Sequence, residues 1–161
     1  MRLARVDQTL EVCEVHLTET GSFGTPIENL LTRSLLVVMC AEFEQEIERT
    51  LDERFQTIQD ASVREFLASS VDAVFRSVKV NEIAGLLNRF GGTYKERFNA
   101  KADANPVAVT YYNNIVTNRH EIAHRQGGNV TFQEAKTFYE GGHVVLDFFR
   151  EALLSEGAVP A

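Results

Sequence analysis

Residues 25–51 read TPIENLLTRSLLVVMCAEFEQEIERTL, and this stretch decides the fold class. It opens with helix-start signals, because Thr25 can cap a helix, Pro26 suits the first helical position and Glu28 closes a capping box. Apolar residues then recur at helical spacing in two stripes. The first stripe is Ile27, Leu31, Leu35 and Val38, and the second is Leu36, Cys40, Phe43 and Ile47. We predict one long helix whose first half is buried on two sides.

The segments around this helix carry similar patterns. An amphipathic helix is expected before the TGSFGTP turn of residues 20–26, on the spacing of Leu3, Val6, Leu10 and Leu17. Further helices are expected over about 62–75, 81–90 and 105–124, with a polar connector and one short helix at residues 91–105.

A last helix is expected from TFQE, a capping box formed by Thr131 and Glu134, to Gly157. No segment reads convincingly as a strand. The predicted fold class is therefore all-α, a helical bundle of five to seven helices.

Length and composition favour an ordinary folded protein. At 161 residues, with 44% hydrophobic and 24% charged residues, the whole chain is expected to form a single domain. Cys13 and Cys40 lie in apolar helical patterns without a C-x-x-C partner, which favours reduced core cysteines of an intracellular protein. The first residues lack a signal peptide's apolar run and no 18-residue apolar span occurs, so we expect a cytoplasmic protein and no membrane partner.

Charge is distributed unevenly along the chain. The formal net charge of −7 argues against a protein that coats nucleic acid nonspecifically. Residues 76–101 nevertheless carry 6 basic and 2 acidic side chains, whereas residues 1–75 carry 6 basic and 14 acidic ones. Any RNA would therefore meet a local basic strip, unless these cations only balance the acidic helices.

Residues 117–128, TNRHEIAHRQGG, contain a motif with two readings. From His120 it is H-E-x-x-H, in which His120 and His124 could hold zinc and Glu121 could activate water. The longer zinc-protease pattern needs a third histidine at position 130, where this chain has Val130, and no substrate-binding strand is visible. A zinc hydrolase is therefore kept as the second alternative, and no metal ligand or cofactor is assigned.

From Arg119 the same motif is an arginine, a polar residue and a histidine five positions after the arginine. RHEIAH in this form resembles the signature of the HEPN superfamily of small helical bundles, in particular its RiboL-PSP/MAE-like group. VVMCAEFEQEIERTL, GLLNRFGGTYKERF and VTFQEAKTFYEGGHVVLDFF are similar to that family's early, middle and closing segments. The resemblance covers about residues 26–155, and it departs from the common R-N dipeptide, because His120 follows Arg119 here.

RNA cleavage has chemical requirements that this pair of side chains can meet. A base must take the proton of a ribose 2′-hydroxyl, a cation must stabilise the charge on phosphorus, and an acid must protonate the leaving 5′-oxygen. The unperturbed pKa of histidine, about 6.5, suits the base and acid roles, and arginine grips two phosphate oxygens. We expect Arg119 and His124 to be catalytic and the products to be a 2′,3′-cyclic phosphate and a 5′-hydroxyl.

Helix geometry bears on how this pair can act together. Five residues at about 100° each put Arg119 and His124 some 140° apart on an ideal helix. Either the helix loosens near His124 or the site lies between two chains. The resemblance implies the second case, a homodimer whose two motifs share a cleft.

Supporting roles fall to the neighbours of the motif and to one glutamate. His120, Asn118 and Arg125 are candidate phosphate contacts, and Glu44 is a candidate polariser of His124 or partner of Arg119, by resemblance. Purely structural interpretations stay open: Arg119 could hold a carboxylate of a neighbouring helix, and His124 could be a core histidine. The glutamates Glu42, Glu44, Glu46 and Glu48 mostly suggest a solvated face.

The leading hypothesis is a metal-independent HEPN endoribonuclease acting on RNA, as a toxin or as a defence or stress effector. The first alternative is a HEPN module without catalysis that binds RNA, a nucleotide or a partner protein. An antitoxin or a nucleotidyltransferase-like protein is a further expected partner.

Overall fold

The computed structural model of the protein describes residues 2–74, 78–123 and 130–155, without the side chains of residues 71–74 and 123. Within these ranges the chain forms eight helical segments and no strand, which confirms the all-α class. The segments are α1 (Ala4–Glu19), α2 (Pro26–Phe55), α3 (Ala61–Val74), α4 (Val80–Phe90), α5 (Gly92–Ala104), α6 (Pro106–Ala123), α7 (Phe132–Gly142) and α8 (Val144–Leu154).

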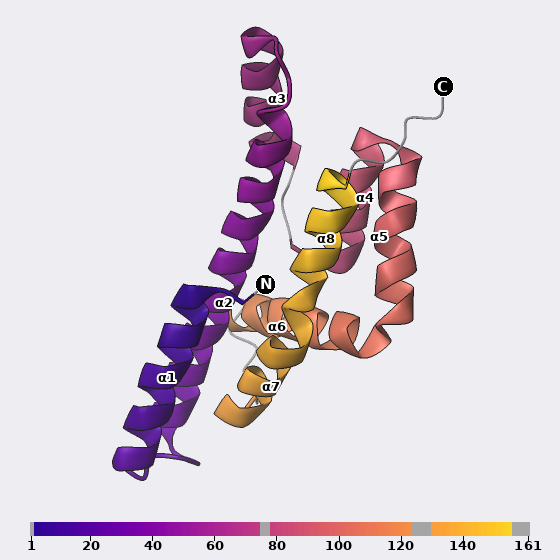
Figure 1. Ribbon diagram of the computed structural model, residues 1–161. Helices are drawn as coiled ribbons and strands as arrows, with labels where there is room; N and C mark the ends of the chain where they lie inside the picture. The colour runs from indigo at the N-terminus through magenta and orange to yellow at the C-terminus, as the bar shows by residue number, and fades with distance from the viewer. Residues whose placement is uncertain (1, 75–77, 124–129, 156–161) are drawn as a thin grey trace.

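The helices are arranged around α2, the longest of them (Figure 1). Helix α1 runs antiparallel along the first half of α2, and α3 lies at its far end, beyond the rest of the bundle. Helices α4, α5 and α8 stand side by side, and α6 crosses beneath them toward α2. No helix of the described part of the chain is long and apolar enough to span a membrane.

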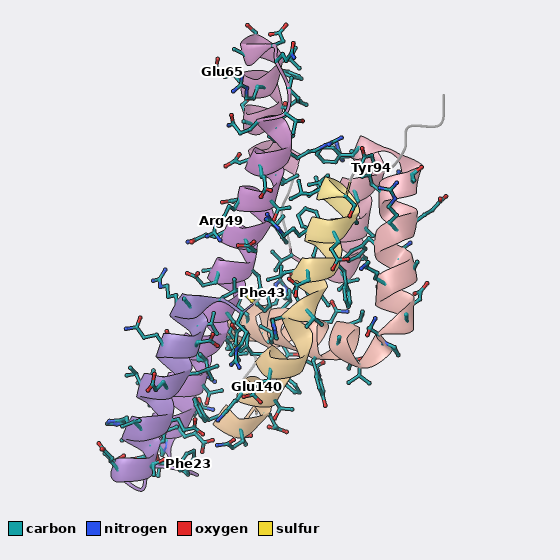
Figure 2. The ribbon with its side chains drawn as sticks, in the orientation of Figure 1. Phe23, Phe43, Arg49, Glu65, Tyr94 and Glu140 are labelled. Carbon is teal, nitrogen blue, oxygen red and sulfur yellow. The ribbon has the colours of Figure 1, made fainter. Side chains whose placement is uncertain are left out.

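The hydrophobic core joins α2 to the C-terminal helices. Phe43 of α2 stacks on Tyr112 of α6, with ring centroids 4.8 Å apart and planes at 8°. Figure 2 shows Phe43 in the middle of the molecule, where α1, α2 and the C-terminal helices meet. Both rings are fully buried, so this stack fixes how α6 sits against α2.

The long helix is confirmed, and within its two predicted buried stripes Ile27 is the residue that departs from the prediction. Leu35, Leu36 and Phe43 are inside, as expected, whereas Ile27 is 46% exposed. Helices α1 and α7 pack against other faces of α2. The stripe that begins at Ile27 therefore turns toward solvent at its N-terminal end.

Glu28 connects the start of α2 to the start of a second helix. Thr25 caps the helix by accepting the N–H of Ile27, and Glu28 Oε2 accepts the N–H of Gly24 at 2.6 Å, one residue before the predicted position. Glu28 Oε1 also accepts the N–H of Phe132 at 2.9 Å. This carboxylate thus joins the N-termini of α2 and α7, and the capping box predicted for Thr131 and Glu134 is present next to it.

Two segments differ from the expected helix limits. Most of residues 91–105, predicted as a connector with one short helix, form the helix α5 (Gly92–Ala104), because Phe98 is completely buried and α8 packs against this helix. The predicted last helix is divided at His143 into α7 and α8. His143 keeps right-handed helical dihedral angles, so the chain turns without leaving helical geometry.

Candidate functional site

Helix α6 carries the described part of the motif, from Arg119 onward, and close packing fixes the position of this helix. The thiol of Cys40 on α2 lies 4.0 Å from the carbonyl oxygen of Ile115. On the other side α7 approaches so closely that a Cβ at Gly142 would come within 2.6 Å of the Tyr112 backbone nitrogen. Because any side chain at Gly142 would push the helices apart, this glycine lets α7 press α6 toward α2.

A pocket of about 260 Å³ opens beside the last turns of α6. Three parts of the chain form it: α2, the segment that enters α4, and α6. Its lining residues are Cys40, Glu44, Val78, Lys79, Glu82, Val116, Arg119 and His120. The pocket brings together three of the residues that the sequence singled out, namely Arg119, His120 and Glu44.

The wall of the pocket has cations and carboxylates in equal number. Arg119 and Lys79 are exposed, as is Glu82, while Glu44 is half-buried. Among the described residues the Arg119 side chain forms no ion pair, so it is not held by a carboxylate of a neighbouring helix. Its guanidinium therefore remains available to an anion that enters the pocket.

The floor of the pocket is apolar. Cys40, Val78 and Val116 are all buried. Burial raises the pKa of the Cys40 thiol to about 12, although the nearby Arg119 cation opposes this shift. The thiol therefore stays protonated at neutral pH, which fits the prediction of a core cysteine and gives Cys40 no nucleophilic role.

Asn118, the remaining described residue among the predicted site residues, does not line this pocket. Asn118 is half-buried, and its side-chain amide donates to the carbonyl oxygen of Asn114 at 2.8 Å, so it is engaged within its own helix. His124 and Arg125 lie outside the described residues. Helix α6 is regular up to Ala123, which places Arg119 and His120 on well-formed helix.

The four clustered glutamates of α2 have different environments. Glu44 faces the pocket, and Glu42 accepts a hydrogen bond from Arg5 of α1 at 3.1 Å. Glu46, expected on a solvated face, is only 2% exposed and pairs with Arg49. The expectation was wrong for Glu46 because α2 is enclosed on this side, where charges of α8 approach it.

Lys79 and Glu82 join the pocket from a part of the chain far from the motif. The sequence marked Lys79 only as one of several basic residues, and it gave no signal for Glu82. Their placement depends on tertiary contacts: Val78 is 2% exposed, and the N–H of Val80 donates to the Asn113 side chain of α6 at 3.4 Å. No pattern in the sequence could have placed Lys79 and Glu82 beside α6.

Other cations of the basic strip, residues 76–101, form contacts within the fold. Lys101 pairs with Glu151, and Arg97 donates to the carbonyl oxygen of Ser155 at 3.3 Å. Arg54 and Arg97 both lie against the ring of Tyr94, at 5.8 and 5.9 Å from its centroid. These contacts stabilise the packing of α5, and among the described residues of the strip Lys79 lines the pocket.

The described part of the chain contains no ready-made group of metal ligands. No three histidine, cysteine, aspartate or glutamate side chains gather there in a way that could hold an ion. The second histidine of the H-E-x-x-H pattern, His124, is not among those residues.

The protein is thus an all-α domain in which α2, α4 and α6 surround a pocket, and Arg119 in that pocket has no ion pair among the described residues. Residues 2–155 match the protein family described as RiboL-PSP-HEPN, and the chain belongs to this family. The resemblance seen in the sequence began at about residue 26, and this match extends it to include the first helix, α1. No curated protein and no solved structure matches the chain.

Proposed function

We propose that this protein is a metal-independent endoribonuclease of the HEPN type. One observation carries the proposal: Arg119 of the motif lines a solvent-accessible pocket with His120 and Glu44, without a carboxylate partner among the described residues. Family membership supports a HEPN module, and the arrangement of these side chains favours binding of a phosphodiester there.

The proposed reaction is an internal transfer at phosphorus. A base removes the proton of the ribose 2′-hydroxyl, the 2′-oxygen bonds to phosphorus, and the bond from phosphorus to the 5′-oxygen breaks. The leaving 5′-oxygen takes a proton from an acid. Arg119 stabilises the extra negative charge on the phosphoryl oxygens, and His124 serves as base or acid, a role that rests on the motif.

Two neighbours of Arg119 have positioning roles in this scheme. His120, one residue further on α6, contacts the phosphate from the side of the same pocket. Glu44 lines the same pocket from α2 and is proposed as the polariser of His124. It does not bind the phosphate itself, because two anions repel each other. Asn118 and Arg125 remain candidate phosphate contacts at the edge of the motif.

Cleavage of mixed cellular RNA in the presence of EDTA tests the proposal. The wild-type protein should cleave, and Arg119→Ala and His124→Ala should each lose at least about 100-fold in rate, the typical loss for a charge-stabilising or proton-transferring group. Arg5→Ala is the matched control, because Arg5 is exposed on α1 and lies outside both the pocket and the basic strip, and it should keep the wild-type rate.

Other outcomes would assign a different function. Absence of cleavage by concentrated wild-type protein would favour a HEPN module that binds RNA, a nucleotide or a partner protein. Stoichiometric zinc held by His120 and His124, together with activity that a chelator abolishes, would replace the ribonuclease by a zinc hydrolase.

The biological setting that we propose is a cytoplasmic toxin or defence effector that works as a homodimer. The family resemblance alone supports an antitoxin or a nucleotidyltransferase-like partner. Co-purification of the protein with the product of a neighbouring gene, and suppression of RNA cleavage by that product, would test this setting.

A further inference from the structure

A second pocket, of about 400 Å³, lies at the far end of α2. The last turn of α2, the residues that follow it, α3 and the second half of α4 form its walls. Among the described residues it shares no lining residue with the pocket that contains Arg119. Its volume falls in the range of sites that enclose small molecules, about 300–1,000 Å³. We call it the end pocket.

Polar contacts hold the start of α3 in place beside the end pocket. Asp60 caps α3, because its Oδ1 accepts the N–H of Ser62 at 2.9 Å. Arg64 of α3 donates to Oε1 of Gln56, the residue that ends α2, at 3.0 Å. These bonds fix α3 relative to the end of α2, so the wall that α3 contributes belongs to the fold.

The interior of the end pocket is apolar. Phe55 and Leu86 are only 2% and 5% exposed, and Ile58, Leu67 and Phe90 are partly buried against the core beside them. The rings of Phe55 and Phe90 stack with their centroids 6.1 Å apart, so the ends of α2 and α4 are in direct contact. Each methylene group of a ligand that leaves water for such walls tightens binding roughly fourfold.

Two hydroxyl groups also line the end pocket, but neither has a hydrogen left for a ligand. Thr57 donates to the carbonyl oxygen of Arg54 at 2.8 Å, and Ser70 donates to that of Phe66 at 2.7 Å. A hydroxyl has a single hydrogen to donate, and both are used within the backbone. The described part of the wall therefore offers no uncharged side-chain donor to a polar ligand.

Two arginines give the end pocket a positive charge. Arg54 is half-buried and donates to the Tyr94 hydroxyl at 2.9 Å, while Arg89 is exposed on α4. Figure 2 shows Tyr94 between the end of α2 and α5. Neither arginine forms an ion pair among the described residues, and no described lining residue is a carboxylate. In a chain with 23 acidic and 16 basic side chains, two such arginines at one pocket select an anion.

These features together select one class of ligand. The arginines suit a carboxylate, which accepts hydrogen bonds from a guanidinium on two oxygens. The apolar walls suit a hydrocarbon body. A nucleotide fits poorly, because its ribose and base acceptors would be buried here without donors.

We propose that the end pocket binds a small apolar monoanion, a medium-chain fatty acid or another carboxylic acid with an unbranched hydrocarbon body. The carboxylate lies between Arg54 and Arg89, and the hydrocarbon lies among Phe55, Leu86 and Phe90. This proposal does not rest on the proposed function, because the residues of the Arg119 pocket have no part in it.

Calorimetric titration of the full chain with octanoate, hexanoate and 1-octanol tests the class of ligand. Octanoate should bind one molecule per chain. Hexanoate should bind roughly 15-fold more weakly, because it buries two fewer methylene groups. 1-Octanol has the same chain without the charge and should bind at least about tenfold more weakly. Absence of saturable octanoate binding at several millimolar, or equal affinity for all three compounds, would overturn the proposal.

Matched variants test the position of the site. Arg89→Gln removes an exposed cation without disturbing the core and should weaken octanoate binding at least about tenfold, whereas Arg5→Gln, exposed on α1, should bind like wild type. Leu67→Trp should block the pocket, and Phe66→Trp, at a 69% exposed position outside it, should not. Equal octanoate affinity of the Arg89 and Arg5 variants, or wild-type affinity of Leu67→Trp, would exclude this site.

Two further measurements separate the end pocket from the proposed nuclease site. Arg119→Ala should keep wild-type affinity for octanoate, and AMP should not displace octanoate. Displacement by AMP would assign the end pocket to a nucleotide and overturn the proposal. Octanoate binding by a protein that never cleaves RNA keeps this inference and removes the nuclease, whereas RNA cleavage without octanoate binding removes this inference alone.

Discussion

The two halves of α2 belong to one continuous helix, yet they present different surfaces to solvent. The exposed residues between Pro26 and Val37 are uncharged, whereas the exposed residues between Gln45 and Glu53 are Gln45, Glu48, Arg49, Asp52 and Glu53. A charged surface keeps a helix solvated. The difference teaches that α2 has an uncharged half and a charged solvent half, with the pocket at their boundary.

The two halves of α2 also differ on the buried face of the helix. Glu28 and Glu46 lie on one line of the helix, five turns apart, and both are buried. Glu28 accepts two backbone N–H groups, whereas Glu46 Oε1 has no partner among the described residues. Burial raises the pKa of Glu46, and the charges of Arg49 and Arg150 oppose that rise.

The largest expected effect breaks the Glu28 link. Glu28→Ala should lower the free energy of unfolding by about 3 kcal/mol, because the buried N–H of Phe132 loses its acceptor. Glu28→Gln keeps one acceptor oxygen and should lose about half as much. Urea unfolding measures both, and a Glu46→Ala variant that loses as much as Glu28→Ala would contradict the difference between the two carboxylates.

Glu46 should make the stability of the protein depend on pH. Its pKa is raised in the fold, so the folded state holds the proton more tightly than the unfolded state does. The resulting stabilisation is present below the unfolded pKa, about 4.3, and is lost as pH rises through the raised folded pKa. Glu46→Gln should therefore gain stability relative to wild type as pH rises to 7.

Urea unfolding midpoints of wild type and Glu46→Gln, measured at several pH values between about 4 and 7, check this expectation. Glu48→Gln, exposed on the same helix, serves as the control and should follow the wild-type profile. A constant difference between Glu46→Gln and wild type at every pH would count against a raised pKa.

The smallest expected effect concerns the solvent half. Arg150 of α8 donates to Glu53 at 2.6 Å, and the two side chains are 36% and 50% exposed. Glu53→Gln should cost only about 0.5 kcal/mol, and the cost should vanish in 1 M salt, roughly the concentration that shortens screening to a few ångströms. A loss comparable to that of Glu28→Ala would show that this half also carries a structural link.

The candidate site could be predicted in part from the sequence. The motif gave Arg119 and His120, and the family resemblance gave Glu44, all three of which line the pocket. Lys79 and Glu82 reach the same pocket through the packing of Val78 and the contact of Val80 with Asn113. No spacing in the sequence encodes such a contact, because its two sides are separated by 33 residues.

The sequence by itself determined the helical class, the course of α2 and the capping box of α7. Local periodicity and capping chemistry are sufficient for these features, since they act within a few residues. Only the tertiary structure decided that Glu28 and Glu46 are buried and that Ile27 is exposed. The apolar pattern of a helix marks the face that can be buried, but a neighbour such as Phe132, 104 residues from Glu28, decides which side chains are covered.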